Sequence, residues 1–243
     1  DMGFDLAAGR VPVVPTAHYM MGGLVFRPDG STALPGLFAA GEDTGGVHGA
    51  NRLGGNGVAN STVFGGIAGD TMAAWVPREG ALVEPDGAAL DAAIAALEAP
   101  FARPARNLSP LRDALQEMMW DKAGILRDAA GLADAASGLD ALEAELDSSG
   151  VDGTNRAFNM TWHDWLNLKS LLLVSRAIVV ASLAREESRG AHWREDFPET
   201  RDDSAGLAAT SVRLEAGRVA LDWQKVAFSR LKPGESLLQA AAE

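Results

Sequence analysis

Residues 48–57 read His-Gly-Ala-Asn-Arg-Leu-Gly-Gly-Asn-Gly and lead into a run of small and apolar residues from Val58 to Val76. The run predicts a helix that ends near Pro77, because proline interrupts the helical hydrogen-bond ladder. Glycines leave backbone N–H groups accessible, and a helix N-terminus carries partial positive charge. Arg52 adds a planar cation suited to carboxylate or phosphate. The stretch therefore predicts an anion or cofactor site, although it lacks the G-x-G-x-x-G fingerprint of dinucleotide-binding folds.

The composition is that of a globular protein. The 243 residues are 47% hydrophobic and 22% charged, and the formal net charge of −12 argues against a general nucleic-acid binder. The absence of cysteine excludes disulfides and thiolate metal ligation by this chain. We expect no direct membrane span, because the most apolar run, residues 171–184, contains Arg176 and is shorter than the roughly 20 residues that a span needs. Residues 1–5 do not resemble a signal peptide.

The region before residue 70 is rich in glycine. Its short apolar runs at residues 11–14, 23–26 and 37–40 predict short strands, and Arg27-Pro28-Asp29-Gly30 predicts a turn. The sequence therefore begins with part of an α/β domain.

After residue 86 the chain becomes rich in alanine, and apolar residues recur at helical spacing. Pro100 and Pro104 predict breaks, and Ser109 before Pro110 predicts a helix N-cap. A further helix is expected after Gly131. The expected apolar faces are Leu90, Ile94 and Leu97; Leu111, Leu115, Met118, Met119 and Leu126; and Leu132, Ala136, Leu139, Leu142 and Leu146.

The longest expected helix covers residues 161–187. Its middle is apolar nearly all round, so we expect it to be the central and most buried helix. The tail predicts a β-hairpin from residues 210–214 and 218–226, joined by a turn at residues 215–217. The predicted fold class is α+β and mainly helical: part of an α/β domain, a helical bundle and a small C-terminal β-hairpin.

Two short motifs add functional groups to the glycine-rich region. His18 stands between Pro15 and the pair Gly22-Gly23, which favours presentation of its ring in a loop; a structural or solvated histidine is the alternative. Glu42 follows a strand-like run at residues 36–41, where a carboxylate can accept hydrogen bonds from a ribose; an ordinary turn carboxylate is the alternative.

Residues 185–203 alternate in charge, which indicates a salt-bridged, solvated segment after the long helix. His192 and Glu195 are metal ligands by type, but no third ligand converges on them, so we expect no metal site. We interpret Trp162, Trp165 and Trp193 as core or interface residues.

Together these strings resemble the flavoprotein subunit of succinate dehydrogenase and fumarate reductase, in a superfamily shared with L-aspartate oxidase. The matching strings are residues 15–23, 41–42, 48–56 and 187–203. The resemblance covers only the C-terminal part of such a subunit. It implies three parts: residues 1–76 as the C-terminal portion of the FAD-binding domain, residues 77–205 as a helical bundle domain, and residues 206–243 as a β tail.

The resemblance implies FAD as the cofactor and a C4 dicarboxylate as the substrate. His18 and Arg52 are then the catalytic residues that hold the substrate carboxylate. Any covalent flavin attachment site would lie outside this chain.

The resemblance also implies the cofactor contacts, at Glu42 on the FAD ribose and at Arg52, Asn56, Gly57 and Val58 near the flavin. Two positions depart from the family pattern. Gly57-Val58 stands where the family usually has Ser-Leu, and Asn60 stands where an acid is common.

The resemblance implies a reaction that interconverts succinate and fumarate and passes electrons to an iron–sulfur partner. The expected location is cytoplasmic, at the inner face of the membrane through partner subunits. We expect no complete catalytic cycle from these residues alone, because the family's proton-shuttle arginine lies upstream of the matching part. Two alternatives stay open: an L-aspartate oxidase-like flavoenzyme, and a helical interaction module without redox activity.

Overall fold

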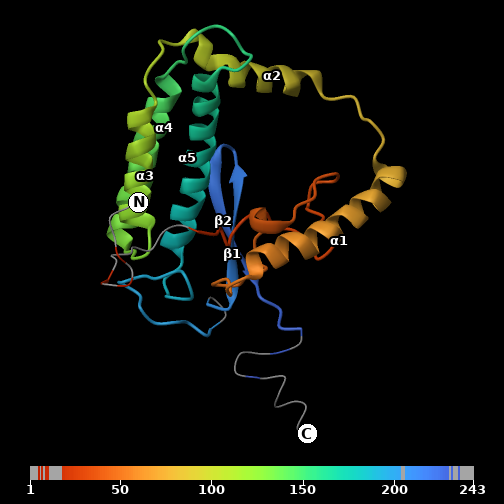
Figure 1. The fold of residues 1–243 in the computed structure, drawn as a ribbon, viewed down its shortest axis with the longest axis vertical. Coiled ribbons are helices and arrows are strands. Elements are labelled where there is room, and N and C mark those ends of the chain that lie inside the picture. The colour runs from red at the N-terminus through yellow and green to blue at the C-terminus, as the bar shows by residue number, and fades with distance from the viewer. Residues whose placement is uncertain are drawn as a thin grey trace. The chain divides into compact units, whose positions relative to one another are not determined.

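The computed structural model describes residues 5, 7, 9–10, 18–203, 206–229, 231 and 235 (Figure 1). They form two compact units, residues 1–81 and 82–243. The fold is α+β and mainly helical, which confirms the predicted fold class. Its elements are η1 (Gly41–Asp43), α1 (Asn56–Glu79), α2 (Gly87–Glu98), η2 (Ala99–Ala102), α3 (Ser109–Ala123), α4 (Ala129–Ser148), α5 (Met160–Ala184), β1 (Ala208–Glu215) and β2 (Arg218–Lys225).

The prediction of strands at residues 23–26 and 37–40 is wrong. Each region forms a single backbone bridge instead, Leu24 with Thr44 and Ser31 with Phe38. The chain reverses too soon for a longer ladder, because the predicted turn at residues 27–30 is present and a second turn follows at residues 34–37. The strand expected at residues 11–14 lies outside the described residues.

Helix α1 begins two residues before its expected start and continues through Pro77 to Glu79. Pro77 has no N–H to donate to the Ala73 carbonyl, and the helix ends two residues later at Glu79. Only Asn60 and Ala68 of this helix are buried. Gly30, at φ +83°, packs against Ala68, and a Cβ there would lie 2.6 Å from the Ala68 Cβ.

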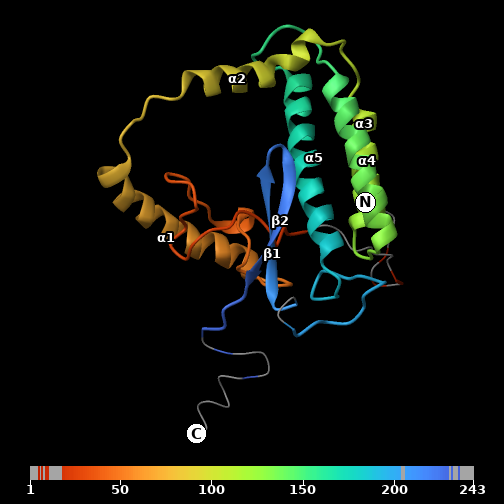
Figure 2. The same cartoon turned by 180° about the vertical axis from the view of Figure 1, so that it is seen from behind.

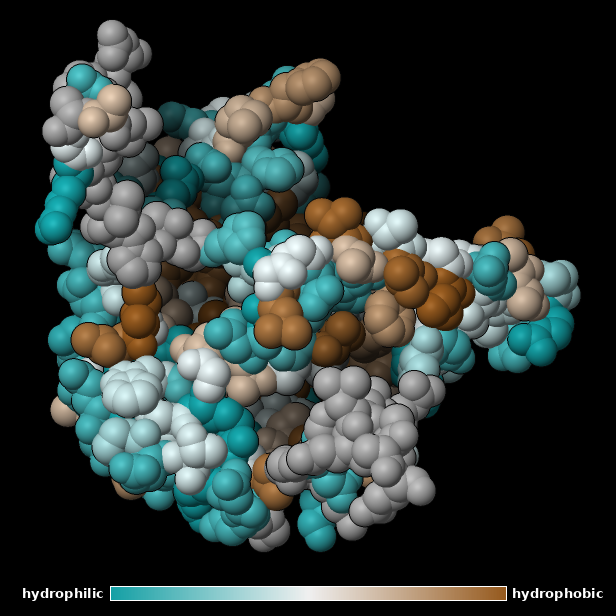
Figure 3. Space-filling view, turned by 60° about the horizontal axis from the view of Figure 1, so that its bottom comes forward, coloured by the Kyte–Doolittle hydropathy of each residue, from teal (hydrophilic) through white to brown (hydrophobic). Residues whose placement is uncertain are grey.

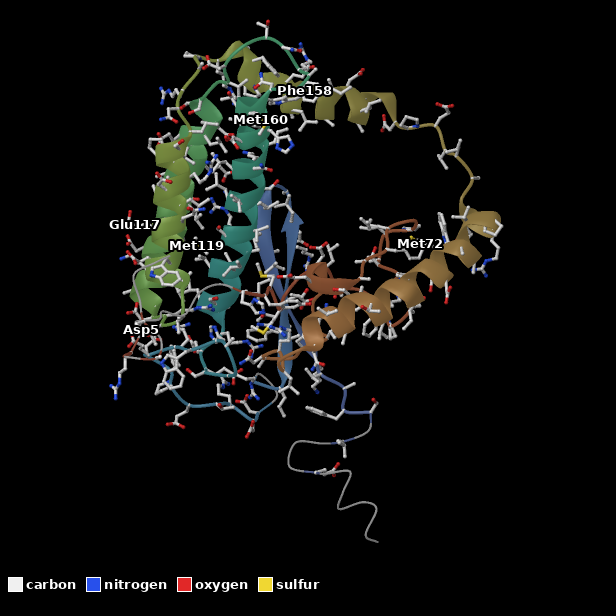
Figure 4. All side chains as sticks on the ribbon, in the orientation of Figure 1. Asp5, Met72, Glu117, Met119, Phe158 and Met160 are labelled. Carbon is white, nitrogen blue, oxygen red and sulfur yellow. The ribbon has the colours of Figure 1, made fainter. Side chains whose placement is uncertain are left out.

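The exposed surface of α1 carries large apolar side chains on more than one side of the helix. Its exposed large apolar side chains are Val58, Val63, Ile67, Met72 and Val76. Figure 3 shows exposed apolar side chains in brown, and Figure 4 labels Met72 on this helix. This surface has no covering layer among the described residues of the first unit.

Helices α3, α4 and α5 lie side by side and form the bundle of the second unit (Figures 1 and 2). Three leucines of α4, Leu132, Leu139 and Leu146, are fully buried, as their spacing predicts. Trp165 of α5 is buried against them and donates its indole N–H to the Leu146 carbonyl at 3.0 Å. The bundle is therefore the main hydrophobic core of this unit.

Helix α5 is less buried than its sequence indicates. One face, which includes Leu168 and Leu172, packs in the core, while Leu171, Leu173 and Val174 are exposed. The helix is long and apolar enough to cross a membrane by length and composition. In the structure Lys169 and Arg176 form ion pairs with acids of α4. Phe158 and Met160, where α5 begins, are exposed as well (Figure 4).

The expected N-cap at Ser109 is wrong, because Ser109 is already the first residue of α3 and its side chain makes no capping bond. The Asn107 side chain instead accepts a hydrogen bond from the Ser109 N–H at 3.0 Å. Helix α4 begins at Ala129, two residues before Gly131. The Asp128 carboxylate caps this helix by accepting a hydrogen bond from the Gly131 N–H. Short polar side chains therefore start both helices, as capping chemistry requires.

The C-terminal hairpin is confirmed. β1 and β2 pair in antiparallel register, and the hairpin packs on α5. Ala216 and Gly217 form its two-residue turn with φ of 48° and 77°. Two residues with positive φ are the geometry of a type I′ hairpin turn.

Arg194 closes the C-terminal end of α5. It is 1% exposed, and its Nη1 donates to the carbonyl oxygens of Ser182 (2.9 Å), Leu183 and Arg185. Its other two nitrogens form a two-bond pair with Asp196, both at 2.7 Å, which lowers the pKa of Asp196 to about 2. One guanidinium thus satisfies carbonyls that a helix end leaves without partners.

We predict that Arg194→Met lowers the free energy of unfolding by about 3 kcal/mol, because buried carbonyls and the Asp196 carboxylate lose their donor. The matched control is Arg213→Met, which removes an exposed pair with Glu215 and should change stability by less than about 1 kcal/mol. Urea unfolding followed by circular dichroism measures both. Equal effects of the two substitutions would contradict the role given to Arg194.

His192 is held between two partners. Its Nδ1 lies 3.1 Å from the Arg127 guanidinium and its Nε2 lies 3.2 Å from the Arg185 carbonyl oxygen. Burial, together with the charges of Arg127, Arg185 and Arg194, lowers the pKa of His192. The neutral ring therefore accepts a hydrogen bond from the Arg127 guanidinium at Nδ1 and donates one from Nε2 to the Arg185 carbonyl oxygen.

We predict that stability falls as the pH drops below about 6.5, the ordinary histidine value. In that range the unfolded His192 takes up a proton while the folded ring, with its lowered pKa, stays neutral. The free energy of unfolding stops falling once the pH is below the pKa of His192 in the folded protein. Urea unfolding at several pH values should show a flatter profile for His192→Gln. The exposed His163 provides the control, since His163→Gln should keep the parent profile.

Candidate functional site

Two loops of the first unit are joined through their backbones at Gly23. The Leu24 N–H donates to the Asp43 carbonyl at 2.7 Å, and the Gly45 N–H donates to the Leu24 carbonyl at 3.0 Å. A Cβ at position 23 would lie 2.2 Å from the Asp43 carbonyl oxygen. Only glycine permits this approach.

The joined loops bring the expected ribose-binding carboxylate to the loop that carries His18. Glu42 is exposed in η1, and its Oε1 accepts a hydrogen bond from the Met20 N–H at 2.8 Å. His18 is exposed two residues earlier in the chain. Thr44 is buried and donates its hydroxyl to the Gly41 carbonyl at 2.6 Å, which fixes the η1 turn.

Arg52 is half-buried in the same cluster. Its guanidinium carbon lies 4.7 Å from the centre of the Tyr19 ring, and its backbone N–H points to the Met21 sulfur at 3.0 Å. Nη1 donates to the Leu53 carbonyl at 3.3 Å. The buried Nε has no hydrogen-bond partner in the described part of the chain. Because an unpaired buried donor is unfavourable, this N–H is ready to receive an acceptor.

Asn60 joins the cluster from the second turn of α1 and is 4% exposed. Its Nδ2 lies 3.2 Å from the Gly41 carbonyl, 3.3 Å from the Tyr19 hydroxyl and 3.3 Å from Nε2 of His48. No role was expected from the sequence for the Tyr19, His48 or Asn60 side chains. Two signals could have found them: Tyr19 is the sole tyrosine of the chain, and Asn60 is a polar residue four positions after Asn56 in a helix of small apolar residues.

The start of α1 leaves backbone donors accessible. Its N-cap is Gly55, at φ +83°, which supplies no capping side chain. Asn56 and Val58 are exposed on the first turn, and a Cβ on Gly54 or Gly55 would meet no atom within 4 Å. The expected anion site therefore has an open helix N-terminus with free space around its glycines.

Gly57 has a steric reason to differ from the family serine. A Cβ at this position would lie 2.9 Å from Cε2 of Tyr19, closer than side chains normally approach. The Tyr19 ring occupies the space that a serine side chain would enter.

Residues 185–203 form a structural network. Glu187 is 1% exposed and pairs with Arg185 and Arg189. His192 uses both ring nitrogens within this network. The segment is salt-bridged as expected, but the expectation that it is solvated is wrong, because Glu187 and Arg194 are buried. Among the described residues no group of three or more histidine, aspartate or glutamate side chains is arranged to hold a metal ion.

The chain matches two family models. Residues 112–237, more than half of the chain, match the model for the fumarate reductase flavoprotein C-terminus, and residues 2–58 match an FAD-binding domain. These matches define a flavoprotein with FAD as its cofactor, in which a cofactor-binding segment precedes a helical domain. The chain belongs to the fumarate reductase flavoprotein family, which confirms the resemblance found in the sequence.

Curated relatives and solved structures agree with this assignment. The fumarate reductase flavoprotein subunit of Mycobacterium tuberculosis is 38% identical over 95% of this chain and 41% of that protein. L-aspartate oxidase of Streptomyces coelicolor is 36% identical over 89% of the chain and 36% of its own length. Quinol fumarate reductase of E. coli superposes with a TM-score of 0.86 at 31% identity, covering 96% of this chain and 41% of that one. The chain thus spans about two fifths of the relatives it matches.

The residues present fit one side of an FAD site. The uncapped start of α1 offers N–H groups to an electron-rich ring or phosphate, and Glu42 offers a carboxylate to a ribose. The open space at Gly54 and Gly55 leaves room for a ligand, and Nε of Arg52 has no hydrogen-bond partner among the described residues.

We predict that Gly23→Ala separates the loops that carry His18 and Glu42, because its Cβ collides with the Asp43 carbonyl. Amide hydrogen exchange by NMR should then show loss of protection at Met20 and Leu24, whose N–H groups donate across this contact. A Cβ on Gly22 meets no atom within 4 Å, so Gly22→Ala should keep the parent protection. Unchanged protection in Gly23→Ala would show that the loops do not depend on this contact.

Proposed function

We propose that this chain supplies substrate-binding and flavin-binding residues of an FAD-dependent oxidoreductase that interconverts succinate and fumarate. The observation that carries the proposal is Arg52, a half-buried cation with an unpartnered Nε beside the open start of α1. The family match and the relatives' names support the same activity.

Bound FAD supplies hydride transfer to or from the dicarboxylate. Arg52 binds one substrate carboxylate, because a guanidinium donates two parallel hydrogen bonds to a planar anion and remains charged at every relevant pH. His18, exposed on the neighbouring loop, donates to the same substrate. These groups orient the dianion without rearrangement during the reaction.

The other residues hold the cofactor. Glu42 would accept hydrogen bonds from the ribose, and the first turn of α1, which contains Asn56, Gly57 and Val58, would offer backbone N–H groups to the flavin. The positive end of that helix would favour negative charge on the cofactor. Arg52 reinforces this effect with its own charge.

The chain acts as part of a larger assembly. We propose an iron–sulfur protein as the electron acceptor and a cytoplasmic site at the inner face of the membrane, held there by partner subunits. Solved relatives that support this include the quinol fumarate reductase of E. coli and a quinol-fumarate reductase with menaquinol molecules. The 243 residues alone are expected to be inactive, and residues 1–76, 77–205 and 206–243 act as cofactor-binding, helical and β parts.

An L-aspartate oxidase-like activity is the second candidate, because two relatives named L-aspartate oxidase are 36% and 38% identical to this chain. Both substrates carry the carboxylate that Arg52 would bind. Turnover of succinate and of aspartate by the intact flavoprotein separates the two. Reduction of the flavin by aspartate alone would replace the main proposal with this one.

We predict that Arg52→Ala in the intact flavoprotein lowers kcat/KM for the dicarboxylate by about 100-fold or more, because one carboxylate loses its half-buried cationic partner. The FAD content, read from the visible spectrum, should stay normal. Arg78→Ala is the control, since Arg78 is exposed in the last turn of α1. Unchanged turnover in Arg52→Ala would favour the non-catalytic interaction module instead.

A further inference from the structure

Tyr19 lies against the guanidinium of Arg52. The 4.7 Å separation between the guanidinium carbon and the ring centre is within the range of a cation–π contact. The Tyr19 ring therefore occupies one side of the guanidinium. A carboxylate that accepts two parallel hydrogen bonds must then approach an edge that the ring leaves free.

The Tyr19 hydroxyl is held by hydrogen bonds with Asn60 and His48. Asn60 Nδ2 lies 3.2 Å from the Gly41 carbonyl, which can only accept, so the amide nitrogen faces this cluster. The same nitrogen donates to the Tyr19 hydroxyl at 3.3 Å. The hydroxyl in turn lies 3.4 Å from Nε2 of His48 and can donate its own proton to that atom.

Two further contacts restrict the ring itself. The His48 ring meets it edge-on, with centres 5.3 Å apart and planes at 82°. The backbone of Gly57 borders it so closely that a Cβ would lie 2.9 Å from Cε2 of Tyr19. The ring therefore has a single position set by His48, Asn60 and Gly57, independently of Arg52.

We infer that Tyr19 is a positioning residue for Arg52, and that Asn60, His48 and Gly57 fix Tyr19 in place. The inference rests on the proposed role of Arg52 in binding a carboxylate. Tyr19 selects the direction from which that carboxylate approaches, while Arg52 supplies the charge. Gly57 is part of the same arrangement, because the absence of a side chain there leaves room for the Tyr19 ring.

NMR of the full 243-residue chain tests this arrangement without substrate or cofactor. The side-chain protons of Arg52 over the Tyr19 ring should have upfield shifts from the ring current. Tyr19→Leu should abolish that upfield shift, and Gly57→Ala should reduce it by displacing the ring. Tyr19→Phe should retain most of it, because the ring contacts with His48 and Gly57 remain.

The control is Gly65→Ala, a substitution in the same helix at a glycine whose added Cβ meets no atom within 4 Å; it should leave the Arg52 signals unchanged. Circular dichroism checks that each variant is folded. If Tyr19→Leu fails to fold, Gly57→Ala and Tyr19→Phe decide. Arg52 signals that are the same in the parent, Tyr19→Leu and Gly57→Ala would overturn the inference.

The intact flavoprotein separates this inference from the proposed function. Tyr19→Leu should raise KM for the dicarboxylate by about fivefold with a smaller change in kcat, and Tyr19→Phe should restore most of the loss. If the NMR shifts respond as expected while Arg52→Ala leaves turnover intact, Tyr19 still positions Arg52 and the proposed function is wrong. If KM in Tyr19→Leu is unchanged although Arg52→Ala abolishes turnover, the positioning role is wrong.

Discussion

The close backbone contact at Gly23 is the constraint on which the candidate site depends. It joins the loop of His18 to the loop of Glu42 through the Leu24–Thr44 bridge. The other contacts of the cluster, from Met20 to Glu42 and from Tyr19 to Arg52, follow from that juxtaposition. Residues far apart in the sequence thus form one surface because a single position lacks a side chain.

The two units are stabilised in different ways. The bundle buries a continuous set of leucines and closes the end of α5 with Arg194, so it has its own core. In the described residues of the first unit, turns and backbone bridges are joined by contacts of Phe26 with Phe64 and of Phe38 with Trp75, and α1 buries only Asn60 and Ala68.

Most periodic features were predictable from the sequence, and three-dimensional polar contacts were not. Helical spacing identified the buried face of α4, and the Glu215-Ala216-Gly217 turn identified the hairpin. The apolar face expected in α2 is wrong, because Leu90, Ile94 and Leu97 are exposed. The degree of burial of α5 was overestimated, because composition cannot show which apolar face has a partner. The prediction of strands at residues 23–26 and 37–40 was wrong, because strand pairing depends on residues that are distant in the sequence.

The site shows the same division. The strings around His18, Glu42 and Arg52 indicated a cofactor site and its family, because those residue types are set by chemistry. The contact of Tyr19 with Arg52 and the bonds of Asn60 with Tyr19 join positions up to 41 residues apart in the sequence. No local pattern encodes such contacts.

If Arg52 and Glu42 face one bound FAD–dicarboxylate pair, an experimental structure of the intact flavoprotein with FAD and a C4 dicarboxylate should show both contacts. A carboxylate should lie within about 3 Å of the Arg52 guanidinium nitrogens, at an edge that the Tyr19 ring leaves free, with the ribose at Glu42. A dicarboxylate bound elsewhere, with Arg52 and Glu42 contacting neither ligand, would contradict this arrangement.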